Sequence, residues 1–296
     1  MEIREIQAFL RAAQCQSISK AAASLGYTQA AVTIQIKQLE KSLNTKLFDR
    51  VGNKIFLTEQ GETFASYANT ILKEIALAKD ALSEDKVPTG SLVIGTIESI
   101  CAAIFPSLLQ KFHKLYPKVN INVITGSPNE LLQQMDDNSI DIVYFMDQKK
   151  YNTKWAKIIE DPVEILFVTP AHSPLAHKGP MPLAELIKEP FLLTEKDASY
   201  RYVLDQHLAA RGLKIRPFLE SGNTDFVLRS LRQEQAVTFL PKFSVQTDIK
   251  NGTLVNVPVS DFQLKIWRQV VYRKDRYITS EMQAFINLVK QEEVFY

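Results

Sequence analysis

The sequence has few cysteines: only Cys15 and Cys101 occur among 296 residues, far apart and without the spacing of metal ligands. Two such residues exclude a disulfide framework, so we expect a reducing compartment, the cytoplasm. No apolar run approaches the roughly 20 residues that a membrane-spanning helix needs, so we expect no membrane partner. Charged residues at positions 2, 4, 5 and 11 argue against a secretion signal.

The motifs of common enzymes are also missing. The chain has no G-x-S-x-G, no Walker sequence, no G-x-G-x-x-G and no H-E-x-x-H. Its four histidines, at positions 113, 172, 177 and 207, lack the clustering that a metal site needs. We therefore expect no catalytic site, no metal and no other cofactor.

Charge is unevenly distributed along the chain. The whole sequence has a net charge of +2, from 35 Lys/Arg and 33 Asp/Glu. Residues 1–60 hold eight Lys/Arg against five Asp/Glu, a net charge of +3, whereas the remainder holds 27 against 28. Surplus positive charge at one end is typical of a module that approaches a polyanion.

The first sixty residues predict three short helices and a hairpin. Apolar residues recur at helical spacing from position 3 to position 13, and Ser19 is a candidate cap for a second, alanine-rich helix. Gly26 supplies a tight turn, and Thr28 can accept a backbone hydrogen bond at the start of a third helix. A Gly-Asn pair between "LFDR" and "KIFLT" is a hairpin signal. Residues 1–58 therefore read as a helix-turn-helix followed by a basic wing.

The third helix has two unlike faces. One carries Val32, Ile36 and Leu39 at helical spacing, and these should face a core. A recognition helix must enter a major groove about 12 Å wide, which requires outward side chains that are short or able to read base edges. The opposite face consists of such residues: Gln29, Ala30, Thr33, Ile34 and Lys37.

Several of these side chains suggest individual roles. Gln29 can make paired hydrogen bonds to adenine, Thr33 can contact a base or a phosphate, and Ile34 can touch a thymine methyl. The alternative for wing residues is a solvated surface or, for the arginine, an ion pair that braces the wing. Candidates for phosphate contacts that position the fold are Ser17, Ser19, Arg50, Asn53 and Lys54.

One long helix is predicted next, from near Thr58 to about Asp85, before the linker "VPTG". Its apolar residues are separated by four, three, four, three and four positions, which is a heptad seam. Such a narrow stripe needs a covering partner, so we expect residues 59–90 to mediate dimerisation; the alternative is packing against the same chain. The seam comprises Phe64, Ala68, Ile71, Ile75, Ala78 and Leu82.

From residue 91 onward, strands alternate with helices. "LVIGT" and "VNINVIT" bracket a helix from about Ser99 to Leu115, a second series begins near Asp161, and the chain closes with "IWRQVVY" and "SEMQAFINLVK". Such βαβ series predict a parallel sheet, hence an α/β fold for residues 91–296. We assign residues 91–161 and 266–296 to one lobe and 162–265 to another. A cleft between lobes is a default ligand site.

The chain resembles the LysR-type transcriptional regulators over its whole length. The matching segments are "SISKAAASLGYTQAAVTIQIKQLE", "LFDR" and "LTEQG", and "FPSLLQKFHKLYP" with the βαβ series is similar to that family's effector-binding domain. The resemblance implies a winged helix-turn-helix that binds a dyad-symmetric site in double-stranded DNA, a dimerising linker helix, and a periplasmic-binding-protein-like effector domain. It further implies a homodimer or homotetramer, a small-molecule effector, and RNA polymerase as a further candidate partner.

The resemblance also implies an effector site between the lobes. Helix N-termini favour anions, but the carboxylate of Glu98 would oppose one. If Glu98 faces the cleft, we expect the effector to bring a donor or a positive charge; the alternative is that Glu98 and Ser99 only cap a helix. The matching positions are Thr96, Glu98, Ser99, Ile100, Ser127, Asn129, Thr194, Ser199, Asn223 and Thr224.

Three further features depart from the family pattern or add to it. Ile34 stands where the family often carries Arg, which removes a basic contact. Gln233-Glu234-Gln235 replaces a Gly-containing turn, so that turn must be built differently. Cys101, near a helix N-terminus beside the cleft, could have a lowered pKa and act as a redox sensor; the alternative is a buried structural cysteine.

Two other classes of protein are alternatives. One is an enzyme built on the two-lobed fold, and the other is an intracellular solute-binding or sensor protein, a role that the same fold also serves. The second alternative leaves the first ninety residues without a purpose. We therefore predict a sequence-specific DNA-binding transcriptional regulator whose activity a small molecule modulates.

Overall fold

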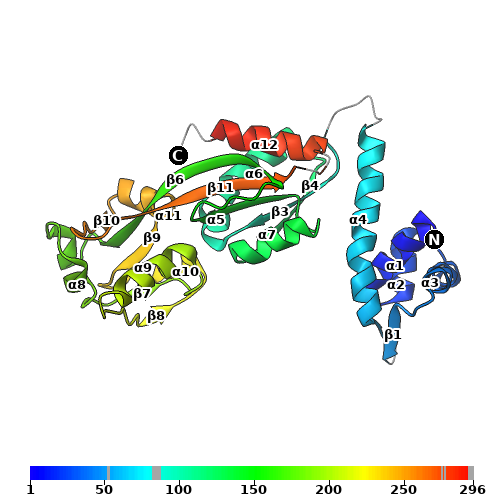
Figure 1. Cartoon of the computed structure of the whole chain (residues 1–296), viewed down its shortest axis with the longest axis horizontal. Helices are drawn as coiled ribbons and strands as arrows, with labels where there is room; N and C mark the ends of the chain where they lie inside the picture. Colours follow the sequence, from blue (N-terminus) through cyan, green and yellow to red (C-terminus); the bar gives the residue numbers. More distant parts are fainter. Residues whose placement is uncertain (52–53, 82–87, 275, 277, 293–296) are drawn as a thin grey trace. The chain divides into compact units, whose positions relative to one another are not determined.

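The chain forms two compact units, residues 1–86 and 87–296 (Figure 1). The structure, a computed structural model, describes residues 1–51, 54–81, 88–274, 276 and 278–292. Each unit has its own apolar core. Over the residues described, no helix combines the length and apolarity needed to cross a membrane.

Three helices begin the first unit: α1 (Ile3–Cys15), α2 (Ile18–Leu25) and α3 (Gln29–Leu43). As predicted, Gly26 adopts φ +70° and the hydroxyl of Thr28 accepts a hydrogen bond from the N–H of Ala31 at 3.2 Å. The prediction that Ser19 caps the second helix is wrong. The N-cap is Ser17, whose hydroxyl accepts from the N–H of Lys20 at 3.4 Å, because α2 begins two residues earlier than expected.

The predicted hairpin follows α3. Strands β1 (Phe48–Val51) and β2 (Lys54–Leu57) pair antiparallel, with Phe48 opposite Leu57. Ile55 is buried against the helices, which attaches the wing to the helical core. The Gly-Asn pair that suggested the hairpin lies outside the described residues.

Helix α4 (Glu59–Ala81) ends the described part of the first unit. The heptad prediction needs correction, because the first half of the seam packs against its own chain. Ala68 is fully buried, and Phe64 and Ile71 are partly buried against the core of α1 and α3. The ring of Phe64 lies 5.2 Å from that of Phe9. Ala78 is exposed, and Leu82 lies outside the described residues.

The sheet of the second unit is mixed rather than parallel. Its order is β10-β6-β11-β5-β3-β4, with β9 also paired to β6. The parallel pairing that the βαβ pattern predicts holds for β3 with β4 and with β5, whereas the other pairs of this sheet are antiparallel. Strands β7 and β8 form a separate parallel pair. The difference arises because the late strand β11 returns between β5 and β6.

Two long strands run through both lobes, β6 (Trp155–Pro170) and β11 (Leu264–Arg273), so the predicted lobe boundaries fall inside strands (Figure 1). The first lobe contains β3 (Ser91–Thr96), α5 (Glu98–Ala103), α6 (Phe105–Leu115), β4 (Asn120–Thr125), α7 (Pro128–Asp136), β5 (Ile142–Asp147) and α12 (Ser280–Glu292). The second contains the 3-10 helix η1 (Pro174–His177), α8 (Leu183–Leu186), β7 (Leu192–Leu193), α9 (Ser199–Ala209), β8 (Leu219–Glu220), α10 (Thr224–Leu231), β9 (Thr238–Pro241), α11 (Lys242–Lys250) and β10 (Leu254–Asn256).

Two local predictions in this unit can be compared with the backbone. The single helix expected from Ser99 to Leu115 is two helices, α5 and α6, because Pro106 lies in the first turn of α6 and favours a new start there. The turn at residues 233–235 is built without glycine or positive φ. The N–H groups of Gln233 and Glu234 donate to carbonyls three residues earlier, at 3.1 and 3.2 Å.

Candidate nucleic-acid interface and ligand pocket

The outward face of α3 is accessible over most of its length. Gln29, Ala30, Ile34 and Lys37 are exposed, whereas Val32 is buried on the opposite side. The exposed fraction of Ile34 is 55%, large for an isoleucine on a packed helix. This face therefore presents an apolar side chain, an amide and one lysine without any acidic neighbour among them.

The remaining predicted DNA contacts differ in what they can offer. Thr33 is half-buried, and its hydroxyl donates to the carbonyl of Gln29 at 2.8 Å, leaving its oxygen lone pairs as acceptors. Ser17 is engaged as the cap of α2, Ser19 is exposed beside it, and Lys54 is exposed on the wing. The side chain of Arg50 and the whole of Asn53 lie outside the described residues.

A carboxylate fixes the wing relative to α3. Oε1 of Glu40 accepts hydrogen bonds from the N–H groups of Leu47 and Phe48, at 2.8 and 3.4 Å. Leu47 is fully buried, so the strand enters the wing from an anchored position. The pattern of apolar residues did not predict this brace, because the bond joins residues seven and eight positions apart through a turn.

Sequence reasoning missed three exposed residues near the same face: Tyr27, Gln38 and Lys41. Tyr27 precedes α3 in the turn and has an exposed fraction of 48%. Gln38 and Lys41 follow Ile34 and Lys37 at a spacing of four. Because residues four apart lie on the same face of a helix, this spacing could have indicated from the sequence that the outward face of α3 continues for one more turn.

The second unit contains a cavity of about 350 Å³ between its lobes. Five of the ten predicted effector residues line it: Glu98, Ser99, Ser127, Ser199 and Thr224. Four of them lie at the starts of α5, α9 and α10, and Ser127 is the N-cap residue just before α7. The volume lies within the range of sites for small molecules.

The other five predicted residues do not line the cavity, and the structure gives a reason for each. Thr96 is fully buried, and its hydroxyl donates to the carbonyl of Tyr144 at 2.8 Å. Ile100 belongs to the apolar core, and Thr194 is 2% exposed. The amide oxygen of Asn129 accepts from Nζ of Lys150, and that of Asn223 caps α10 by accepting from the N–H of Phe226.

Two contacts join the lobes across the cavity. The carboxylate of Glu98 accepts the N–H of Thr224 at 3.0 Å and also the hydroxyl of Thr224. The hydroxyl of Ser199 donates to the carbonyl of Met146 at 2.9 Å. Glu98 therefore faces the cleft and serves the start of α10 in the opposite lobe, rather than only capping its own helix.

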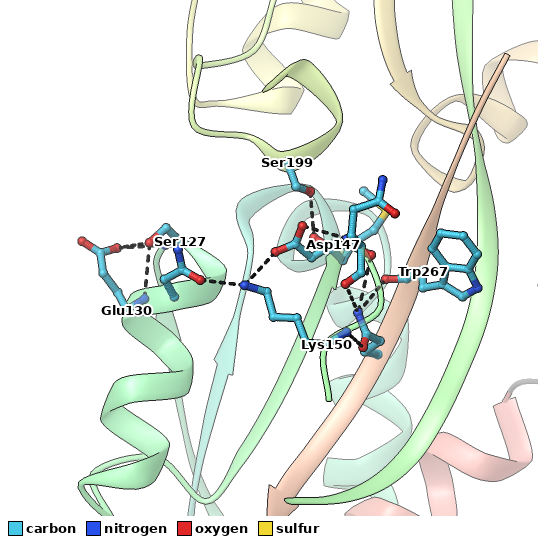
Figure 2. Close-up of polar contacts among 10 residues, drawn as sticks. Ser127, Glu130, Asp147, Lys150, Ser199 and Trp267 are labelled. Carbon is cyan, nitrogen blue, oxygen red and sulfur yellow. Dashed lines mark hydrogen bonds and ion pairs between the residues drawn. The ribbon is translucent and has the colours of Figure 1, made fainter. Parts of the chain in front are cut away.

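The polar groups along the first-lobe wall are paired with one another (Figure 2). The hydroxyl and the backbone N–H of Ser127 donate to Oε2 of Glu130, at 2.7 and 3.0 Å. These two hydrogen bonds hold the pKa of Glu130 below its ordinary value. Nζ of Lys150 donates to Asn129 at 2.7 Å and lies 3.1 Å from the carboxylate of Asp147. Lys150, the basic side chain drawn in Figure 2, is therefore already paired.

Acidic residues of the cavity were also missed by sequence reasoning. Glu130, Glu195 and Asp197 line it together with Glu98. Burial raises the pKa of Glu195, and the charges of Asp197, Glu98 and Glu220 add to that effect. Glu195 and Asp197 lie in the sequence between the predicted residues Thr194 and Ser199, so their carboxylates were a signal available from the sequence.

Comparison with known proteins assigns both units. Residues 3–62 match the model of the bacterial regulatory helix-turn-helix protein, lysR family, and residues 85–293 match the LysR substrate binding domain. The chain belongs to the LysR family. Membership makes it a DNA-binding transcriptional regulator with an effector-binding domain, which corresponds to the sequence prediction and sets the enzyme alternative aside.

Relatives and solved structures of LysR regulators match the chain from end to end. It is 30% identical to the HTH-type transcriptional regulator GltR of Bacillus subtilis over 97% of this chain and 95% of that protein. It is 29% identical to the regulator YwqM of the same species, over 98% and 99%. The full-length structure of CbnR complexed with its target DNA is similar with a TM-score of 0.68 at 17% identity, covering 98% and 99% of the two chains.

The lowered pKa expected for Cys101 is not what the structure of this LysR regulator indicates. Burial raises the pKa of Cys101, and the neighbouring charge of Glu98 raises it further. A reactive sensor thiol needs the opposite shift, since the thiolate is the nucleophile. The helix start that suggested a lowered pKa also carries a carboxylate, whose charge opposes the thiolate.

Proposed function

We propose that this regulator reads its operator through the outward face of α3, and that a small molecule in the cavity between the lobes controls it. The observation that carries the first part is the composition of that face. Gln29 and Ile34 are exposed without carboxylates around them, which suits contact with base edges and a thymine methyl. We place this activity in the cytoplasm, where the DNA is.

The phosphate contacts that position the helix come from its surroundings. Ser19 lies at the exposed start of α2, and Lys54 is exposed on the wing. Lys37 and Lys41 extend the basic surface along α3. Such contacts fix register on the duplex but carry little sequence information, so specificity falls to the side chains of the outward face.

Two copies acting on a dyad-symmetric site complete the proposal. Helix α4 continues beyond the part that packs on α1 and α3, and exposes Ala78 in its second half. We infer that this half, with Ile75, pairs with a second chain, and that a dimer or tetramer sets the two α3 helices about 34 Å apart or a multiple of it. RNA polymerase is the proposed protein partner through which the DNA-bound regulator would affect transcription.

The effector acts by favouring one arrangement of the lobes. Glu98 with Thr224, and Ser199 with Met146, already link the lobes across the cavity. A ligand that adds contacts to both lobes stabilises the closed arrangement by its differential affinity for it. We infer that this shift changes subunit packing and the bend of the bound DNA.

A footprinting experiment on the promoter region beside the gene tests the proposal. We expect a protected dyad-symmetric site whose affinity falls steeply with salt, because phosphate contacts release counterions. A Ser99→Ala and Thr224→Val double variant should keep the footprint but lose its response to the effector. Equal binding to any duplex would contradict recognition through α3, and an unchanged response would contradict the cavity as the effector site.

A further inference from the structure

We propose that the molecule bound between the lobes is a small organic cation that carries a protonated amine. This inference rests on the proposed role of the cavity as the effector site. It concerns the charge of the effector, which neither the family match nor the relatives specify.

The charge of the lining is the first observation. Four carboxylates line the cavity, and its described lining contains no lysine, arginine or histidine. The field of such a wall raises the local concentration of cations and lowers that of anions. A carboxylate or phosphate effector would enter without a basic side chain of the lining to meet it. The acidic residues are Glu98, Glu130, Glu195 and Asp197.

The second observation is that one buried carboxylate oxygen of the lining has no hydrogen-bond partner among the described residues. Glu98 is occupied by Thr224, and Glu130 is occupied by Ser127. Oε2 of Glu195 is buried and has no hydrogen-bond partner among the described residues. The backbone of Gly222 borders this oxygen, since a Cβ added there would lie 3.3 Å from it.

A buried carboxylate oxygen without a partner is unfavourable unless a donor or a cation reaches it. Lys196, between Glu195 and Asp197 in the sequence, is exposed and does not line the cavity, and two other basic side chains near the cavity are already engaged. Lys150 contacts Asn129 and Asp147, and Arg201 donates to Asp205 at 2.9 Å and to the carbonyl of Thr194 at 3.0 Å. An ammonium group on the effector would supply the missing charge-assisted hydrogen bond.

An organic cation suits this cavity better than a metal ion does. The described residues include no group of three or more His, Cys, Asp or Glu side chains able to hold a metal. Ile97, Met146 and Tyr200 contribute apolar lining that can cover a carbon skeleton. The cavity of about 350 Å³ is also far larger than a single ion requires.

The ionisation of Glu195 gives the binding a characteristic pH dependence. Its pKa is raised by burial, then by the charges of Asp197, Glu98 and Glu220, of which Glu220 lies 3.7 Å from Arg201. A cation binds the ionised form, so protonation of Glu195 competes with binding of the amine. Amine affinity should therefore fall as the pH drops through the pKa of Glu195 and level off above it.

Titration calorimetry on the full-length protein with probes matched in shape tests the proposal. One set is putrescine, 1,4-butanediol and succinate, and the other is benzylamine, benzyl alcohol and benzoate. We expect the amine of at least one set to bind at least tenfold more tightly than its alcohol and its carboxylate. Glu195→Gln should weaken that amine at least fivefold, whereas Glu164→Gln, an exposed carboxylate outside the cavity, should not change it.

Asp197→Asn provides a second variant in case Glu195→Gln disturbs folding, because Asp197 is exposed and contributes the same charge. Tighter binding of a carboxylate probe, failure of every amine, or amine binding that neither variant weakens would overturn the inference. Carboxylate binding that Ser99→Ala weakens would overturn the cationic class and still support the cavity as the effector site. Probe binding that no cavity variant changes would instead contradict the proposed function itself.

Discussion

At the scale of single residues, the side chains of α3 have two opposite environments. Val32 and Leu39 are fully buried, whereas Ile34 is 55% exposed on the other side of the same helix. Leaving a large apolar side chain in water forgoes roughly 1.5–3 kcal/mol of burial free energy. A thymine methyl would recover part of that free energy.

Gln29→Ala should weaken binding to the operator by about 1–3 kcal/mol while leaving binding to random duplex almost unchanged. The reason is that the side chain is exposed at the first position of α3, where an amide can form paired hydrogen bonds to a base. Fluorescence anisotropy on operator and random duplexes of equal length measures both. Gln206→Ala, an exposed glutamine in α9, serves as the control. Equal losses on both duplexes would show that Gln29 does not read bases.

At the scale of elements, the two halves of α4 differ in what they contact within the chain. Its first half is part of the core of the first unit, through Phe64, Ala68 and Ile71. Its second half exposes Ala78. The same heptad pattern therefore continues from the half of α4 that packs within the chain into the half for which we propose a contact with a second chain. The same period suits both, because either partner covers a narrow apolar stripe.

Glutamate substitutions at two alanines separate these purposes. Ala68→Glu would bury a carboxylate, so we expect a loss of at least about 2 kcal/mol in the stability of the first unit. Ala78→Glu should leave that stability within about 0.5 kcal/mol but raise the dimer dissociation constant at least tenfold. Thermal unfolding by circular dichroism and analytical ultracentrifugation measure the two effects. A dimer unaffected by Ala78→Glu would locate the association surface elsewhere.

A buried ion pair holds together three positions of the second unit that are distant in the sequence. Oδ2 of Asp141 accepts the N–H of Val93 in β3 at 2.7 Å, and Oδ1 lies 2.5 Å from Nη2 of Arg276. Arg276 also donates to the carbonyl of Ile140 at 3.0 Å. The exposed fractions of the two side chains are 1% and 3%, so water cannot replace either partner.

Asp141→Asn should destabilise the second unit by roughly 3–5 kcal/mol, because it leaves the guanidinium buried without its counter-charge. Urea unfolding followed by tryptophan fluorescence measures this effect, since both tryptophans, Trp155 and Trp267, lie in this unit. Asp225→Asn removes an exposed pair with Arg229 and should cost less than about 1 kcal/mol. Similar losses for both variants would show that burial does not decide the strength of the Asp141 pair.

At the scale of the whole molecule, DNA binding and effector binding belong to two separately folded units. The first unit contains no tryptophan, so tryptophan fluorescence follows the effector domain alone. A ligand that binds only the folded cavity adds RT ln(1 + [L]/Kd) to the stability of the unit that holds it. The two units can therefore be followed separately in the intact protein.

An effector at a free concentration of 100 times its Kd should raise the stability of the second unit by about 2.7 kcal/mol. The urea midpoint of tryptophan fluorescence should rise accordingly. The DNA-binding unit should gain stability instead from operator DNA, which circular dichroism detects. If the effector raised the stability of the first unit alone, the ligand site would not be the cavity between the lobes.

The sequence by itself determined the features that depend on neighbours along the chain. The turn at Gly26, the cap at Thr28, the two faces of α3 and the hairpin are set by spacings of two to four residues, so they were predictable. The family resemblance rested on the same local pattern. The cap at Ser19 failed because two serines stand within one turn and either can begin a helix.

Only the tertiary structure decided which side chains meet across the chain. Glu98 and Thr224 are 126 positions apart, and no local spacing reveals that one carboxylate serves the other helix start. Local spacing likewise does not reveal the ring contact between Phe64 and Phe9 or the hydrogen bond between Lys150 and Asn129. Nor does it reveal that Oε2 of Glu195 is buried without a hydrogen-bond partner among the described residues. Burial and charge at these places depend on how distant segments pack, which periodicity along the sequence does not encode.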